Sequence, residues 1–215
     1  QSLSSAASDV YKRQIYTCAE DSLARRSAQT ALFHIAEAFV RWIAPILSFT
    51  AHEIWSFMPG DRTESVFLAE WYPLERLHEE EGINHGDWAS IVLVKEAVNK
   101  VIERERNEGV IKGSLGANVC LYAEPKIYAS LAKLGNELRF VTITSKAELR
   151  KIADGDDISE STLSGLRVSL ERSSSDKCVR CWHFIADVGS QSEHPDVCAR
   201  CVDNISGHGE VRAHA

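Results

Sequence analysis

The stretch KCVRCWHFIADVGSQSEHPDVCARC, residues 177–201, holds four of the six cysteines in this chain of 215 residues. They form two Cys-x-x-Cys pairs, Cys178 with Cys181 and Cys198 with Cys201, separated by sixteen residues. Two residues between paired cysteines allow a tight turn to direct both thiolates at one ion, and two such turns complete a tetrahedron of sulfur. This spacing predicts a zinc site whose ligands are the four cysteines.

A pair of disulfides is the alternative reading of these cysteines, and the rest of the sequence disfavours it. The N-terminus lacks the basic region and apolar run of a secretory signal. The most apolar stretch, residues 32–51, is interrupted by Glu37 and Arg41, so it is not expected to span a membrane. We therefore expect a cytoplasmic protein, in which free thiols stay reduced. Cys18 and Cys120 stand apart from the pairs and are interpreted as ordinary thiols.

The predicted zinc site is structural, because four thiolates leave no open position on the ion for water or substrate. Such a site stabilises a segment that is too short to build its own hydrophobic core. His183, His194 and His208 lie nearby and could in principle replace a cysteine, but four cysteines already complete the ligand set.

Basic and aromatic residues lie beside the predicted zinc ligands. Lys177, Arg180 and Arg200 either balance the negative charge of the zinc–thiolate site or contact a phosphate backbone. Trp182 and His183 offer rings that could stack on a base, although packing against the zinc site is the simpler role for Trp182. The net charge of −7 argues against general nucleic-acid binding, so phosphate contacts are expected to be local.

The first half of the chain shows helical periodicity after a polar lead-in. Residues 1–15 have no usable period and are interpreted as a disordered or foreign segment. Helices are predicted over 22–44, 50–58 and 87–108, the second starting with a capping box formed by Thr50 and Glu53. Together they predict an up-and-down helical bundle. The expected apolar faces are Leu32, Ile35, Ala36, Phe39 and Ile43; Leu47, Ala51, Ile54, Trp55 and Met58; and Ile91, Val94, Val98 and Val101.

A different pattern follows Gly109 and predicts a small α/β subdomain. Three β-like runs occur at 118–123, 140–144 and 166–170, and a helical stretch between the first two places Ile127, Leu131, Leu134 and Leu138 on one face. Residues 153–165 are expected to form an acidic surface loop, and residues 171–176 a flexible tether to the cysteine cluster.

Three stretches resemble the bacterial isoleucyl-tRNA synthetase family. KCVRCWHF…HPDVCARCVDNISGHGE, within 177–210, resembles its C-terminal zinc module; RRSAQTALFHIAEAFVRWIAPILSFTAHEIW, at 25–55, resembles its anticodon-binding bundle; and NKVIERERNEGVIKGSLGANVCLYAEP, at 99–125, resembles the segment between them. The resemblance runs from about residue 16 to the end. It implies a mainly α fold, with a helical bundle of the anticodon-binding type at 16–108, the α/β subdomain at 109–172 and a zinc ribbon or knuckle at 173–215.

The resemblance implies the tRNA-recognition part of a ligase that attaches isoleucine to its tRNA using ATP. The family's ATP-binding signatures do not occur in this sequence, so catalysis and editing are assigned to a missing catalytic body, and this fragment alone is expected to be inactive. The implied partners are isoleucine tRNA and that body, and a monomer is expected. The candidate tRNA contacts are Arg180, Trp182, His183, Arg200, Arg25, Arg26, Lys100 and Arg104.

Two other classes of protein also contain a four-cysteine zinc finger. DNA-repair glycosylases end in a similar four-cysteine finger, but a glycine usually follows the second cysteine there, where this chain has Trp182. A stand-alone zinc ribbon that binds protein is the other possibility, and the helical segment upstream disfavours it.

Overall fold

The computed structural model describes residues 12–74, 82–153 and 161–214, and the chain divides into two compact units. Unit 1 consists of Gln1–Arg25 and Glu79–Ala215, and unit 2 of Arg26–His78. The expected boundary near residue 108 is not where the units separate. Among the described residues, no helix has both the length and the apolar character needed to cross a membrane.

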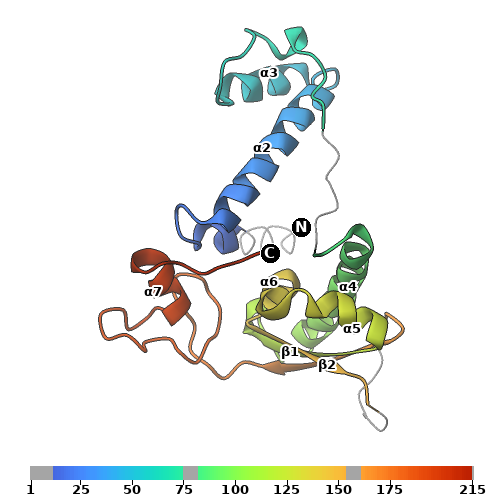
Figure 1. The fold of residues 1–215 in the computed structure, drawn as a ribbon, viewed down its shortest axis with the longest axis vertical. Helices are drawn as coiled ribbons and strands as arrows, with labels where there is room; N and C mark the ends of the chain where they lie inside the picture. Colours follow the sequence, from blue (N-terminus) through green and yellow to red (C-terminus); the bar gives the residue numbers. More distant parts are fainter. Residues whose placement is uncertain (1–11, 75–81, 154–160, 215) are drawn as a thin grey trace. The chain divides into compact units, whose positions relative to one another are not determined.

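Unit 2 is a small helical unit with few buried residues. Helix α2 (Leu23–Ile43) enters it from unit 1, and α3 (Ser48–Phe57) and a short 3-10 helix, η1 (Val66–Leu68), follow (Figure 1). The Nε1 of Trp55 donates to the carbonyl of Thr63 at 2.8 Å, so the loop after α3 is fastened to that helix. The buried apolar residues are Val40, Ala44, Ala51, Trp55 and Val66.

The apolar face expected on the first helix is largely exposed. Leu32, Ile35 and Phe39 are 56%, 61% and 52% exposed, and the buried residues of α2 are Glu37, Ala38 and Val40. The spacing of the apolar residues therefore predicted the helix correctly, but unit 2 buries a different face of α2 from the one predicted.

The expected capping box of the second helix is wrong. Helix α3 begins at Ser48, two residues before Thr50, and its N-cap Leu47 makes no side-chain hydrogen bond. The chain turns directly out of α2, because the amide of Leu47 donates to the carbonyl of Ile43 at 2.7 Å and the carbonyl of Leu47 then accepts from Ala51 at 2.8 Å. Thr50 thus lies inside the first turn. Helix α3 ends before Pro59, as expected.

A buried ion cluster replaces a larger core in unit 2. Glu37 is buried and pairs with Arg41 at 2.6 Å and with Arg62. Both guanidinium groups lie over the ring of Trp55, at 4.7 and 4.6 Å from its centre. The hydrogen bond from Arg62 is the main cause that holds the pKa of Glu37 below its usual value, against the opposing effect of burial.

Unit 1 is built on a three-stranded sheet in the order β2-β1-β3. The central strand β1 (Ala117–Ala123) pairs in parallel with β2 (Lys146–Lys151), with Leu121 opposite Leu149, and antiparallel with β3 (Leu166–Arg172), with Leu121 opposite Val168. The residues of β1 alternate between buried and half-buried, so one face of the sheet carries the core.

Three helices supply the other half of that core: α4 (His85–Asn107), α5 (Pro125–Ala132) and α6 (Leu138–Thr142) (Figure 1). Helix α4 has a complete capping box between Asn84 and Asp87, and its expected apolar face is buried. Its buried residues share one cluster with β1 and β3. Helix α4 therefore packs on the α/β core, because its apolar face meets the sheet.

The second β-like run was predicted at the wrong place. Residues 140–144 end helix α6, and Ile143 has a left-handed backbone with φ 56° that terminates it. The strand follows at Lys146–Lys151, where Ala147 and Leu149 face the core and charged residues alternate with them. The expected strands at 118–123 and 166–170 are confirmed.

The expected lead-in and tether are partly ordered. Residues 12–16 are helical, and Gln14 is buried and donates to the carbonyl of Phe140 at 3.1 Å, whereas residues 1–11 lie outside the described chain. Residues 171 and 172 belong to β3, and the amide of buried Ser173 donates to the carbonyl of Gly116 at 2.9 Å. Most of the expected acidic loop also lies outside the described residues.

Candidate metal centre and nucleic-acid interface

The four paired cysteines converge on one point. Their Sγ atoms all lie within 4.8 Å of one another, and all four residues are buried. The Sγ atoms of Cys181 and Cys198 are 3.8 Å apart, which matches the about 3.8 Å between sulfurs of a tetrahedral zinc site with Zn–S bonds of about 2.3 Å. Ile185, Val188 and Val197 pack around the cluster. The donor set and its spacing therefore fit a structural zinc ion.

The first cysteine pair is held by a tight turn. The amide of Cys178 donates to the carbonyl of His183, and the amide of Trp182 donates to the carbonyl of Cys178, both at 2.9 Å. A bridge between Lys177 and Phe184 closes the base of the turn. Trp182 has a left-handed backbone with φ 68°, which lets the chain reverse immediately after the second cysteine.

The second pair lies at the start of helix α7 (Ala199–Ser206). Cys198 is its N-cap and its amide points to the Sγ of Cys178 at 3.4 Å, and the amide of Val179 donates to the carbonyl of Asp196 at 3.1 Å. The two turns are thus joined by backbone hydrogen bonds as well as by the sulfur cluster. Gly189 (φ 75°) permits the approach between them, because a Cβ atom there would lie 2.7 Å from the carbonyl oxygen of Pro195.

Among the four thiols, the surroundings favour ionisation of Cys201 to the thiolate, the form that binds metal. Hydrogen bonds with Cys198 and Cys201 raise the pKa of Cys181, and, although the hydrogen bond with Cys181 lowers it, Cys201 and burial raise the pKa of Cys198. Hydrogen bonds from Cys181 and Cys198 lower the pKa of Cys201 to about 2, with Arg180 and Arg200 contributing against the effect of burial. Although burial lowers it, the Glu210 carboxylate raises the pKa of Arg200 above its usual value. Arg200 therefore stays charged beside the sulfurs.

Two of the expected base-contacting or phosphate-contacting residues are not available on the surface. His183 is 2% exposed, its ring lies edge-on to Phe140 at 5.8 Å between centres, and burial lowers its pKa to about 4. The Arg200 side chain is 10% exposed and pairs with Glu210. The expectation that His183 stacks on a base is therefore corrected, since its neutral ring lies inside the protein.

A basic aromatic patch remains on the surface of the zinc module. Its residues are Arg13, Lys177 and Trp182. The guanidinium of Arg13 lies 3.1 Å from the centre of the half-buried Trp182 ring, and the Nζ of exposed Lys177 lies 4.9 Å from it. Arg180 is half-buried beside this patch and donates to the carbonyl of Thr17 at 2.7 Å. Sequence reasoning missed Arg13, because it lies in the segment that was interpreted as a lead-in.

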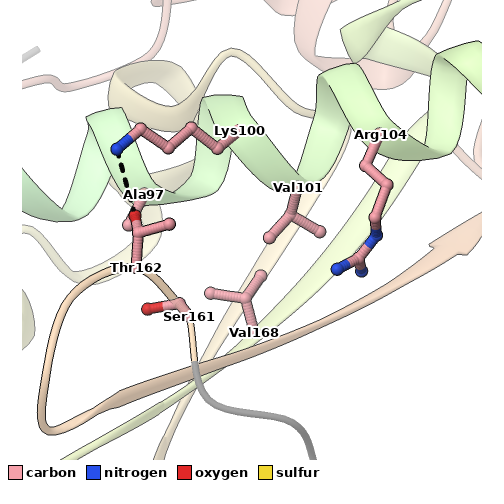
Figure 2. Close-up of a pocket in the computed structure, with 7 residues that line it drawn as sticks. All are labelled: Ala97, Lys100, Val101, Arg104, Ser161, Thr162 and Val168. Carbon is pink, nitrogen blue, oxygen red and sulfur yellow. Dashed lines mark hydrogen bonds between the residues drawn. The ribbon is translucent and has the colours of Figure 1, made fainter.

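The other basic candidates lie on other elements. Lys100 and Arg104 line a pocket of about 170 Å³ between α4 and the residues before β3, none of whose lining residues belongs to the zinc module (Figure 2). Lys100 donates to the Thr162 hydroxyl at 3.3 Å, and Arg104 pairs with Glu105 at 3.0 Å. Arg25 is half-buried and Arg26 exposed in the first turn of α2, on either side of the division between the units.

Comparisons with known proteins identify the class of this chain. Residues 1–121 match the family described as the anticodon-binding domain of tRNA ligase, and residues 175–204 match the zinc finger found in FPG and IleRS. The chain belongs to the anticodon-binding domain family of tRNA ligases.

The most similar relatives narrow this class. The chain is 52% identical over 208 residues to an isoleucine–tRNA ligase of Teredinibacter turnerae, and 52% identical over 209 residues to those of Pseudomonas paraeruginosa and Pseudomonas aeruginosa. Each match covers 96% of this chain and 22% of the relative. The chain therefore spans about a fifth of the length of the relatives that it matches, and the expected resemblance to bacterial isoleucyl-tRNA synthetases is confirmed.

Proposed function

We propose that this chain is the tRNA-recognition part of an isoleucine–tRNA ligase, which attaches isoleucine to its tRNA using ATP. The relatives support this proposal because they match 96% of the chain and carry that name. Neither candidate from another class is favoured, since the helical units upstream of the zinc finger match a tRNA-ligase family as well. Adenylate formation and editing are assigned to the remainder of the enzyme, in the cytoplasm, and this chain is proposed to act in a monomer.

The proposed metal is one zinc ion bound by Cys178, Cys181, Cys198 and Cys201. Bound zinc supplies a rigid cross-link between the two turns and has no open ligand position for chemistry. The four cysteines are the buried residues of a small apolar cluster in the zinc module, and the apolar side chains that pack against them in the described chain are only partly buried. The ion is therefore proposed to determine whether residues 177–206 fold.

The observation that carries the RNA-binding proposal is the placement of Trp182. A bulky side chain with a left-handed backbone costs roughly 1–2 kcal/mol relative to the right-handed form, a cost that glycine at this position would avoid. This backbone places the half-buried indole ring against the cations Arg13 and Lys177. The guanidinium of Arg13 lies over the face of this ring, and an indole with a stacked guanidinium plane suits an unpaired base with its phosphates. We assign this patch to the unpaired bases of the anticodon.

The other basic residues are assigned to the RNA backbone. Arg26 and Arg104 are exposed, and Lys100 donates to the neutral hydroxyl of Thr162. Arg25 is half-buried at the start of α2. Phosphate contacts of this kind position the RNA and carry no base sequence, so they are proposed to add affinity without selectivity.

The exposed apolar residues of unit 2 are assigned to the missing catalytic body. Phe49 and Phe57 are 93% and 83% exposed, and Phe57 lines a hollow of about 420 Å³ together with Ile54, Met58 and Pro59. Contiguous apolar surface of this kind marks an interaction site. About four-fifths of the length of each relative lies outside the match, which supplies a partner within the same enzyme.

The test is binding of the zinc-loaded chain to isoleucine tRNA and to a non-cognate tRNA at one fixed salt concentration. Trp182→Ala is expected to weaken binding of the cognate tRNA by about 5–150-fold, because stacking on an aromatic ring contributes roughly 1–3 kcal/mol per base. Trp71→Ala, at an exposed tryptophan of unit 2, is the matched control and should change little. Zinc content of each variant is measured alongside. Equal affinity of Trp182→Ala and Trp71→Ala with full zinc content would contradict the assignment of the patch.

A further inference from the structure

Three arginines from separate parts of the chain surround the ring of Phe140. Arg139 comes from α6, Arg200 from α7 and Arg212 from the tail after α7, and their guanidinium carbons lie 4.7, 5.1 and 4.0 Å from the ring centre. We call these residues the arginine cluster. The Nε atoms of Arg139 and Arg212 are buried and have no hydrogen-bond partner in the described part of the chain.

The arginine cluster holds more positive than negative charge. Glu210 accepts from the Nε of Arg200 at 2.6 Å and lies 3.9 Å from Arg212, and Arg139 has no ion pair with a described carboxylate. One carboxylate cannot neutralise three guanidinium groups. Because uncompensated buried charge is costly, a second source of negative charge must lie close by.

The four-cysteine site is the neighbour that can supply this charge. Four thiolates around one Zn²⁺ carry a net charge of −2. Arg200 directly precedes Cys201, and the ring of His183, two residues after Cys181, packs on the same Phe140 ring that the arginines surround. The arginine cluster and the metal site are therefore adjacent parts of one interior, with opposite excess charge.

The same arginines hold the N-terminal segment, residues 12–19. Arg200 contacts the hydroxyl of Thr17 at 3.4 Å, and Arg212 donates to the carbonyl of Gln14 at 3.3 Å. Arg180, between the first two cysteines, donates to the carbonyl of Thr17 at 2.7 Å. The described chain continues from this segment into α2, which begins at Leu23.

We propose that the metal–thiolate site and the arginine cluster form one charge-compensated unit, so that metal occupancy holds residues 12–19 on the zinc module. Arg139 acts in this unit as a positioning residue for the metal site, although it lies 39 residues before the first ligand. The proposal rests on the proposed zinc site and is independent of tRNA binding.

The first test measures zinc affinity by competition with a chromophoric chelator, in the full chain. Arg139→Met removes the charge and keeps an extended side chain, and it is expected to weaken zinc binding by about 10-fold, as for other residues that support metal ligands from outside the ligand set. Arg139→Lys keeps the charge and is expected to recover most of the affinity. Arg172→Met, at the exposed end of β3, is the matched control and should bind zinc as the parent does.

The second test measures amide hydrogen exchange of residues 12–19, with peptides from β1 as the internal reference. Chelation of zinc in the parent chain and Arg139→Met in the zinc-loaded chain are both expected to speed exchange in this segment and to leave β1 unchanged. An unchanged rate of amide exchange in residues 12–19 when zinc is removed overturns the proposal. So does an Arg139→Lys variant that binds zinc as weakly as Arg139→Met, because packing alone then explains the loss. A parent chain that binds no zinc at all overturns the proposed metal site itself.

Discussion

Glu37→Gln tests whether a buried ion cluster, more than its small core, keeps unit 2 folded. The carboxylate is almost fully buried and faces the guanidinium groups of Arg41 and Arg62, whose side chains are themselves only 15% and 12% exposed. Glutamine keeps the shape and one acceptor oxygen but removes the charge, which leaves two cations facing each other. Removing one partner of a buried ion pair costs roughly 3–5 kcal/mol.

The expected loss is large in comparison with the rest of unit 2. Five buried apolar residues make up its core, and small cores supply only about 3–5 kcal/mol of stability. A loss of about 3 kcal/mol corresponds to an increase of about 150-fold in the opening equilibrium. Hydrogen exchange of amides in α3 and η1 is therefore expected to speed by about that factor, while exchange in β1 stays unchanged because it belongs to unit 1.

Glu53→Gln is the control for this prediction, because Glu53 is exposed on α3 and has no ion pair with another described residue. It is expected to change exchange in unit 2 by less than about 2-fold, as surface substitutions usually do. The reasoning is refuted if the two glutamine variants exchange at the same rate in α3, since the ion cluster then contributes nothing to stability.

Three further outcomes follow from the site and from unit 1. Cys198→Ser is expected to abolish tight zinc binding and to remove exchange protection from residues 177–206, with α4 unaffected; retained zinc contradicts it. The hydrogen bond from Lys133, followed by those from Asn84 and Ser130, lowers the pKa of Asp87 from its ordinary value of 3.8 to about 2. Its contribution to stability is therefore complete above pH 4 and is lost as pH falls toward 2, and Asp87→Asn should flatten the pH dependence of unfolding in that window. Finally, six cations are assigned to the RNA, two in the basic patch and four along its backbone, so tRNA binding should weaken with salt at a log–log slope of about −4 to −5, at about 0.7–0.9 per phosphate contact; a slope near −2 contradicts the backbone assignment.

The features that the sequence predicted correctly are local ones. The spacing within each cysteine pair and between the pairs is enough to predict one four-sulfur site, because only short turns are needed to bring the thiolates together. Helix α4 was predicted for the same reason, since its apolar period lies within its own sequence, although its capping box between Asn84 and Asp87 was not predicted. Neither prediction depended on knowing what packs against the element.

The features that the sequence did not predict depend on contacts between distant residues. Residues 140–144 are β-branched and aromatic, which favours a strand, but Phe140 packs against His183 and the arginines and the segment ends a helix. Strand β2 was missed because it lies at the edge of the sheet and turns only Ala147 and Leu149 to the core. Arg13 and Arg139 could not be assigned to the zinc module, because nothing in their local sequence points to residues more than thirty positions away.

The positive residues near the metal bear on the proposal that a chain of net charge −7 binds RNA. The side chains of Arg200 and Arg212 are largely buried and pair with Glu210 beside the sulfur cluster. They are therefore not available for phosphate contacts. What remains at the surface of the module is one aromatic ring with two cations around it. Such a patch gains little from nonspecific attraction to phosphate, and the surrounding negative charge disfavours RNA that makes backbone contacts alone. In the proposed function, affinity at this site therefore comes from stacking and from base edges, the interactions that carry base selectivity.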